Sequence, residues 1–214
     1  MATYHPDDDT LISFAAGKLT NPLGLILACH LQSCPQCRQR AVHFEAIAGE
    51  LLFSLPATQL SSEAWQSMQA KLASKETTPS LDQRKYRSHS LVPAPLQRFA
   101  GNQFERVKWT GITRIKSYTL PIADKRFSAR LLKIPAGVAV PMHTHAGLEL
   151  TQVIYGGFSD GQGHYLAGDY VEATPHHTHQ PVADKDSDCI CLAVQEGPIR
   201  MTGPLLKWLN PFLA

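Results

Sequence analysis

Residues 137–156 read GVAVPMHTHAGLELTQVIYG, and this stretch decides how the C-terminal half of the chain folds. Successive side chains of a β-strand point to opposite faces, so His143 and His145 share one face. Glu149 follows four residues later and places a carboxylate beside the two imidazoles. Imidazole and carboxylate groups are ligands of divalent metal ions, so the stretch predicts a metal site on a β-sheet.

A further imidazole is expected from a later strand. His176, His177 and His179 all follow Pro175 and can each supply it. Three imidazoles and one carboxylate suit Zn, Fe, Mn or Ni, and in octahedral geometry they leave two positions for water or a ligand. Such a site can react with a small molecule or sense one.

Short apolar runs surround this stretch and are separated by proline and glycine. They cover residues 109–120, 129–134, 149–158, 164–172 and 189–194. Many short strands at close spacing predict a sandwich or barrel. Cys189 and Cys191 share one strand face. Small buried thiols in a β core are common, and oxidation together with a nearby metal site is a second hypothesis for this pair.

The stretch resembles the first motif of the cupin family. The pattern is glycine, five residues, HxH, three residues, Glu, six residues and glycine, and it matches without a gap at Gly137, His143, His145, Glu149 and Gly156. A second cupin motif matches more loosely at Gly168 and Asp169, with Leu166 where the family usually has proline. The register of that motif implies His179 as the third imidazole ligand and leaves His176 and His177 as rivals.

The N-terminal half has a different pattern. Residues 10–74 show helical spacing of apolar side chains, interrupted at Gly17, Pro22, Pro35 and Pro56, which predicts four short helices. The core of so small a domain is thin, so a metal or a partner is expected to help stabilise it. The segment 60–72 is amphipathic and is expected either to pack within the domain or to present an apolar face to a partner.

The expected fold is therefore α+β with two domains. Residues 1–75 form a four-helix metal-binding domain and residues 97–214 form an all-β cupin barrel. Residues 76–96 are rich in Ser, Thr, Pro and charge, and they are expected to be a flexible linker.

A second candidate metal site lies in the helical half. Cys34 and Cys37 flank a turn with Pro35 between them, the compact way to supply two zinc ligands. His30 lies four residues before Cys34, on the same helix face or near its end. His5 can complete the tetrahedron from the start of the chain, and His43 is a competing donor. Two thiolates, two neutral imidazoles and Zn²⁺ sum to zero charge, which lowers the cost of burial.

Composition and charge exclude several classes of protein. The chain has 214 residues, is 43% hydrophobic and 18% charged, and carries a formal net charge of +2, which indicates neither disorder nor a nucleic-acid partner. Its five cysteines are an odd count and do not form a secreted disulfide framework. The acidic start MATYHPDDDT is unlike a signal peptide and no stretch is apolar enough to span a membrane, so we expect a cytoplasmic protein.

The order of the two halves resembles the ChrR family of zinc anti-sigma factors. The segments that carry the resemblance are DDDTLISFAAGKL, HLQSCPQCRQRA, HTHAGLELTQVIYG, AGDYVEA and DCICLA. The resemblance implies zinc on His5, His30, Cys34 and Cys37, a divalent metal in the cupin domain, and an extracytoplasmic-function sigma factor as the partner. It also implies transcriptional regulation in which oxidants such as singlet oxygen release the sigma factor, with the cupin domain needed for the response.

Two other functions fit parts of the same sequence. A metal-dependent cupin dioxygenase or isomerase would use the open positions of the His143, His145, Glu149 and His179 site for catalysis, with the helices as an accessory. A metal-storage protein would need rapid exchange from the N-terminal site. A neighbouring sigma-factor gene would favour regulation, and a metabolic operon would favour catalysis.

Overall fold

The computed structural model describes residues 2–74, 90–111 and 114–202. Its helices are α1 (Asp8–Ala15), α2 (Asn21–Ser33), α3 (Pro35–Phe53), α4 (Ser62–Ala73) and α5 (Ala94–Ala100), followed by a short 3₁₀ helix (Phe104–Arg106). The first strands are β1 (Lys116–Thr119), β2 (Phe127–Ile134), β3 (His143–His145), β4 (Glu149–Tyr155) and β5 (Gly157–Ser159). The others are β6 (His164–Leu166), β7 (Tyr170–Ala173), β8 (Val182–Ala183), β9 (Cys189–Glu196) and β10 (Ile199–Met201).

The helices begin where the sequence supplies caps and first-turn prolines. Asp7 caps α1 by accepting a hydrogen bond from the backbone N–H of Thr10 at 2.8 Å. Pro22 and Pro35 occupy the first turns of α2 and α3, where a missing N–H costs nothing. Cys34 ends α2 and also caps α3. The predicted position of Cys34 at the start of the third helix is therefore confirmed.

The strands form a cupin-like β domain made of three antiparallel sheets. The largest has the order β1-β2-β9-β4-β7, and the smaller ones are β10-β3 and β6-β5-β8. Gly156 allows the chain to pass from β4 to β5: its φ is +67°, and an added Cβ would lie 2.2 Å from the carbonyl oxygen of Asp188. The backbone pairing in the described ranges does not close into a ring, so the expected barrel is observed here as three sheets.

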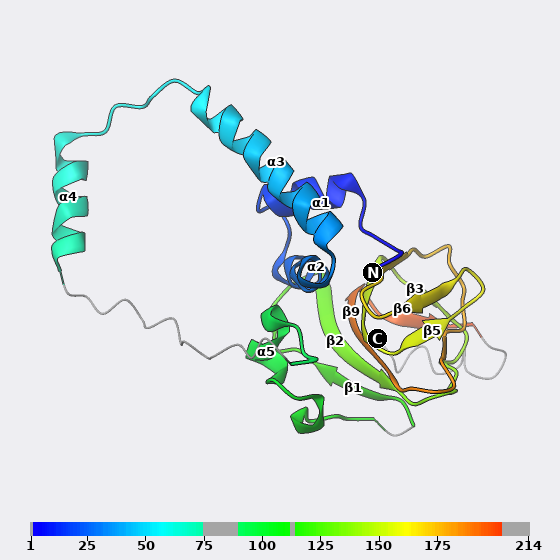
Figure 1. Cartoon of the computed structure of the whole chain (residues 1–214). Coiled ribbons are helices and arrows are strands. Elements are labelled where there is room, and N and C mark those ends of the chain that lie inside the picture. The colour runs from blue at the N-terminus through cyan, green and yellow to red at the C-terminus, as the bar shows by residue number, and fades with distance from the viewer. Residues whose placement is uncertain (1, 75–89, 112–113, 203–214) are drawn as a thin grey trace.

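The helical half and the β domain share one hydrophobic core. The helix α2 packs against β2, β4 and β9 of the large sheet (Figure 1). Its buried Leu25, Ile26 and Leu27 belong to the same cluster as Leu150 and Leu192 of the sheet. The thin core expected for the helical domain is thus completed by the sheet.

Two expectations for the fold need correction. The described ranges contain five α-helices rather than four, because α5 begins at the end of the predicted linker and continues into the first residues of the predicted cupin domain. Residues 76–89 of the expected linker lie outside the described residues, but Val92 and Leu96 are buried and α5 contacts α2. The C-terminal end of the predicted 76–96 linker is therefore packed structure, because its few apolar side chains find a surface on α2.

The second half of α3 and all of α4 extend away from this body (Figure 1). Every residue from 51 to 74 is exposed. The fourth helix is observed where the sequence predicts it, and its apolar side chains are not buried within the chain. Across the described ranges, the helices all lack the combination of length and apolarity required to cross a membrane.

Candidate metal centres

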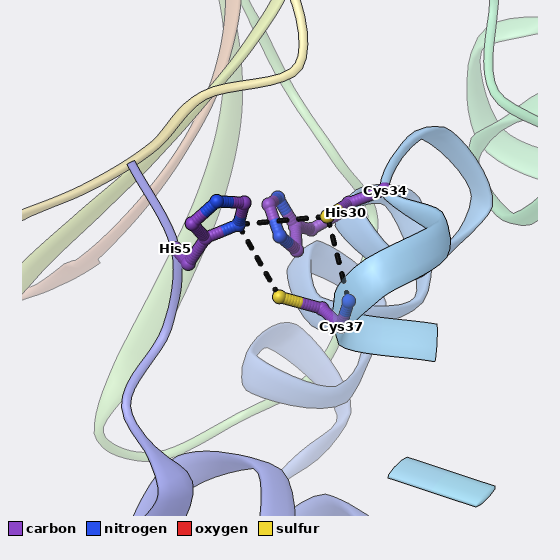
Figure 2. Close-up of side chains that lie close together, drawn as sticks. All are labelled: His5, His30, Cys34 and Cys37. Atoms are coloured by element: carbon purple, nitrogen blue, oxygen red, sulfur yellow. Dashed lines mark hydrogen bonds between the residues drawn. The ribbon is translucent and has the colours of Figure 1, made fainter. Parts of the chain in front are cut away.

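Four predicted ligands meet between the start of the chain and the first helices (Figure 2). His5 precedes α1, His30 lies in the last turn of α2, and Cys34 and Cys37 lie at the start of α3. Each residue offers one donor atom, and these atoms lie within 4.8 Å of one another. His5 Nδ1 is 3.5 Å from Cys34 Sγ and 3.3 Å from Cys37 Sγ. The fourth predicted donor, His5, thus reaches the group from a separate segment.

Burial makes this group suited to a cation. Cys37 is fully buried, and burial together with the neighbouring Cys34 raises the pKa of its thiol to about 12. A thiolate at this position therefore needs a positive charge beside it. Burial also lowers the pKa of His30, which favours the neutral imidazole that binds metal ions.

The orientation of His30 provides a direct test of whether a metal fits. His30 Nδ1 lies 3.1 Å from Gln152 Oε1 and 3.0 Å from the carbonyl oxygen of Gly168. Both atoms are acceptors, so Nδ1 carries the proton and Nε2 keeps its lone pair. That Nε2 is buried and has no hydrogen-bond partner in the structure. Buried polar atoms are normally paired, so the donor set fits a metal ion at this position.

His43 does not join the group. It is exposed on α3 and its ring contacts the neighbouring Phe44 at a centroid distance of 6.3 Å. The competing donor considered from the sequence therefore lies outside the cluster.

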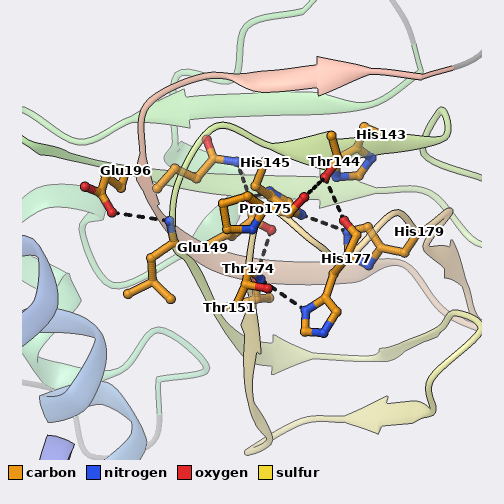
Figure 3. A network of polar contacts seen from close by, with 12 residues as sticks. His143, Thr144, His145, Glu149, Thr151, Thr174, Pro175, His177, His179 and Glu196 are labelled. Carbon is orange, nitrogen blue, oxygen red and sulfur yellow. Dashed lines mark hydrogen bonds and ion pairs between the residues drawn. The ribbon is translucent and has the colours of Figure 1, made fainter.

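The second cluster lies in the β domain (Figure 3). His143 and His145 come from β3, and His179 pairs with His143 through two backbone hydrogen bonds of 3.0 Å. One ring nitrogen from each of the three imidazoles lies within 4.8 Å of the others. His145 Nε2 and His179 Nε2 are 3.2 Å apart. The strand parity predicted for the HxH pair is confirmed, and His179 reaches the pair from a distant segment.

Protein acceptors contact the Nδ1 atom of each imidazole. His143 Nδ1 lies 2.8 Å from the carbonyl oxygen of Pro141, and His179 Nδ1 lies 2.8 Å from Asp160 Oδ2. His145 Nδ1 lies 3.3 Å from Glu149 Oε2. Such contacts leave the three Nε2 atoms as the free lone pairs, the arrangement common in metal-binding histidines. The site therefore fits a divalent metal ion.

Glu149 lies beside the three imidazoles rather than among the grouped donor atoms. Its carboxylate contacts His145 and accepts hydrogen bonds from Thr151 Oγ1 and Gln195 Nε2. Burial raises the pKa of Glu149, but these contacts and the nearby histidines outweigh it, so the net pKa is lowered. Glu149 is therefore a carboxylate at neutral pH, and its direct ligation of a metal stays a prediction.

The rival histidines lie elsewhere. His176 is exposed. His177 Nδ1 accepts a hydrogen bond from the backbone N–H of Thr174 at 3.1 Å, which holds its ring outside the cluster. Of the three candidates after Pro175, the structure brings only His179 to the HxH pair among the described residues.

Cys189 and Cys191 lie side by side on β9. Their Sγ atoms are 3.4 Å apart, both residues are buried, and both are free thiols. The contact with Cys189 and burial raise the pKa of Cys191 well above its ordinary value. The shared strand face is as expected, the burial is typical of small core thiols, and a redox role stays a prediction.

Three residues that support these centres were not predicted as site residues from the sequence. Asp160 contacts His179, Gln152 contacts His30, and Asp169 accepts backbone hydrogen bonds from Thr3 and Tyr4 beside His5. Gly168 and Asp169 were noted only as a cupin motif. No local spacing links any of these residues to the histidine it supports.

Known proteins resemble this chain over both of its halves. Residues 105–200 match the family described as the ChrR Cupin-like domain. The anti-sigma-E factor ChrR of Cereibacter sphaeroides is 37% identical over 210 residues, which cover 98% of this chain and 97% of the relative. A crystal structure of Rhodobacter sphaeroides SigE in complex with the anti-sigma ChrR contains a similar chain. The match has a TM-score of 0.78 and 36% identity, and it covers 92% of this chain and 100% of that one.

Proposed function

Because this chain belongs to the ChrR family of anti-sigma factors, we propose that it binds an extracytoplasmic-function sigma factor and withholds it from core RNA polymerase. Oxidants such as singlet oxygen would release the sigma factor. The similarity covers both halves, so the proposal applies to the whole chain. The relative is an anti-sigma factor, which favours regulation over the cupin dioxygenase or isomerase activity considered from the sequence.

The observation that carries this proposal is the exposed apolar surface of α3 and α4. Phe53 at the end of α3 is 89% exposed, and Trp65 and Leu72 on α4 are 54% and 80% exposed. Trp65, Met68 and Leu72 follow helical spacing and lie on one face of α4. Exposed apolar residues grouped in this way mark sites of protein interaction. An amphipathic helix that docks into an apolar groove is the mode of recognition expected here.

We assign zinc to the N-terminal cluster as part of the proposal. His5, His30, Cys34 and Cys37 would hold it, and bound zinc would cross-link the start of the chain to α2 and α3. The neutral sum of charges and the orphaned His30 Nε2 support this assignment. The cross-link lies at the base of the projecting α3, so it would set the direction in which the apolar surface is presented.

We assign a divalent ion to the cupin cluster, held by His143, His145 and His179 with Glu149 as the fourth ligand. Zn, Fe, Mn and Ni all suit these donors. The same proposal includes a helical metal-binding domain in residues 1–75 and a cupin domain in residues 97–214. It also includes the interpretation of the three sheets as a cupin barrel. An oxidant would act at this centre or at the nearby thiols of Cys189 and Cys191.

Co-purification tests the proposal most directly. The full-length chain would be co-expressed with each extracytoplasmic-function sigma factor of its own genome, with SigE of Rhodobacter sphaeroides as a further probe. We expect a stable complex with one of them that does not bind core RNA polymerase. Failure to form a complex with any of them would contradict the proposal.

A further inference from the structure

The two metal centres lie on opposite faces of one strand. Along β4, Glu149 and Gln152 differ by an odd number of residues, so their side chains point to opposite sides of the sheet. Glu149 contacts His145 of the cupin cluster, whereas Gln152 contacts His30 of the N-terminal cluster. Strand β4 therefore lies between the two centres and contacts a histidine of each.

Gln152 and Gly168 hold His30 from the side opposite its free nitrogen. Gln152 Oε1 and the Gly168 carbonyl both lie within 3.1 Å of His30 Nδ1. Gln152 is 2% exposed, and its own amide donates to the carbonyl of Val153 at 3.1 Å, which fixes the direction of Oε1. The β domain thus fixes both the ring orientation and the tautomer of a predicted zinc ligand.

Asp169 holds the segment that carries His5. Its Oδ1 accepts hydrogen bonds from the backbone N–H groups of Thr3 at 2.5 Å and Tyr4 at 3.1 Å. The N–H of Tyr170 donates to the carbonyl of Tyr4 at 3.1 Å. Asp169 is 2% exposed, and its Oδ2 accepts from the N–H of Leu166 at 2.8 Å. Hydrogen bonds to an ionised acceptor are strong, so this carboxylate anchors the first residues of the chain.

We propose that Gln152, Gly168 and Asp169 are positioning residues for the N-terminal metal site, so that the cupin domain completes that site. This inference rests on the proposed zinc site and extends it. The four ligands all lie in residues 5–37, yet the β domain orients one imidazole and anchors the backbone beside the other. Gln152 and the Gly168 carbonyl orient the His30 ring, and Asp169 holds the backbone just before His5. A change in β4 on the Glu149 side would therefore reach the N-terminal ligands directly, without passing through residues 76–96.

Cobalt binding to the full-length chain tests this inference. Co²⁺ bound to thiolates gives a charge-transfer absorption, and Cys34 and Cys37 are the cysteines of the proposed donor set, so the signal reports the N-terminal site. The variant Gln152→Met removes the acceptor and keeps the side-chain length, and Gln152→Glu restores an acceptor. Asp169→Asn removes the anchoring charge. The matched control is Asp188→Asn, because the Asp188 carboxylate of the β domain accepts instead from the N–H of Ala136.

We expect Gln152→Met and Asp169→Asn to weaken Co²⁺ affinity by about tenfold or more, the usual effect of losing an outer hydrogen bond to a ligand. Asp188→Asn should bind as the wild type does. Gln152→Glu keeps the acceptor for His30 but loses the amide that donates to Val153, so it should bind Co²⁺ more tightly than Gln152→Met does. Circular dichroism would confirm that each variant is folded, and Gln152→Met decides the result if Asp169→Asn does not fold. Wild-type affinity in folded Gln152→Met would overturn the inference. Absence of the thiolate signal in the wild type would instead overturn the zinc assignment itself.

Discussion

The two metal centres are built in different ways. The N-terminal centre joins a chain end, two helices and the face of a sheet, and its donors are two thiols and two imidazoles. The cupin centre gathers three imidazoles within the β domain, with the carboxylates of Glu149 and Asp160 beside them. A buried donor group of two thiolates and two imidazoles, which is neutral with Zn²⁺, suits a structural ion. A donor group of imidazoles that leaves coordination positions open suits a site that reacts with a small molecule. Under the proposed function, we therefore infer that the first centre supports binding of the sigma factor and the second senses the oxidant.

Removing a thiol from the N-terminal centre should have the largest effect on sigma-factor binding. In Cys37→Ser the N-terminal set loses a ligand, and structural zinc contributes on the order of 10 kcal/mol of apparent binding free energy. We expect the variant to lose one metal per chain by elemental analysis and to lose detectable sigma-factor binding in co-purification. Cys29→Ala is the matched control, because Cys29 is buried in α2 but lies outside the cluster. Normal sigma binding by metal-free Cys37→Ser would refute the structural role.

Removing an imidazole from the other centre should have the reverse effect. We expect His143→Ala to lose the cupin metal while it keeps N-terminal zinc and sigma-factor binding. Because the responding centre would be absent, the sigma factor should then stay bound after exposure to singlet oxygen. Release measured by in vitro transcription checks this, with the exposed His176→Ala as the control. Normal oxidant release by His143→Ala would show that sensing lies elsewhere.

A substitution on α4 should weaken binding without touching either centre. Trp65→Glu places a charge on the exposed apolar face, and a buried aromatic anchor at an interface contributes roughly 2 kcal/mol or more, or about a 30-fold change in affinity. We expect that loss in calorimetry with the sigma factor, at unchanged metal content. Ser67→Glu is the control because Ser67 lies about half a turn from Trp65, on the other side of the same helix. Equal losses in both variants would point to charge rather than to the apolar face.

Local spacing predicted the parts of both centres that lie close in sequence. Strand geometry alone places His143 and His145 on one face. Helix geometry alone places Pro35 in a first turn, with Cys34 and Cys37 on either side of it. The donors added by the fold could be proposed from a family register, as for His179, or from the need for a fourth ligand, as for His5.

The supporting residues could not be predicted in this way. Gln152 is 122 residues from His30, and Asp169 is 165 residues from Tyr4, so only the packing of the N-terminal segments on the β domain brings them together. The helix α5 was missed for a related reason. It is only seven residues long and directly follows a polar run, and the surface that buries Leu96 belongs to a distant helix.

The smallest expected effect comes from removing the cap of α1, which should lower stability without changing metal binding. Asp7→Ala removes the cap of α1, which begins just after His5, and should cost about 1 kcal/mol of unfolding free energy. Asp7→Asn keeps a capping oxygen and should cost less. The hydrogen bonds to Thr10 lower the pKa of Asp7 below its ordinary value of 3.8. The folded state thus favours the charged form, so this stabilisation is present above about pH 4 and is lost as pH falls further.

Urea unfolding of the three proteins at pH 7 and near pH 3 would measure this contribution. We expect the difference in unfolding free energy between the wild type and Asp7→Ala to be smaller at the lower pH. Asp7→Asn should show little of this pH dependence, because its amide does not titrate. Cobalt titration at pH 7 should give unchanged affinity in all three, because Asp169 anchors the backbone of Thr3 and Tyr4 just before His5 and does not depend on the cap. A parallel loss of cobalt affinity in Asp7→Ala would mean that α1, and not the 168–169 turn, positions His5. The contribution of the β domain to the N-terminal site would then be limited to the orientation of His30.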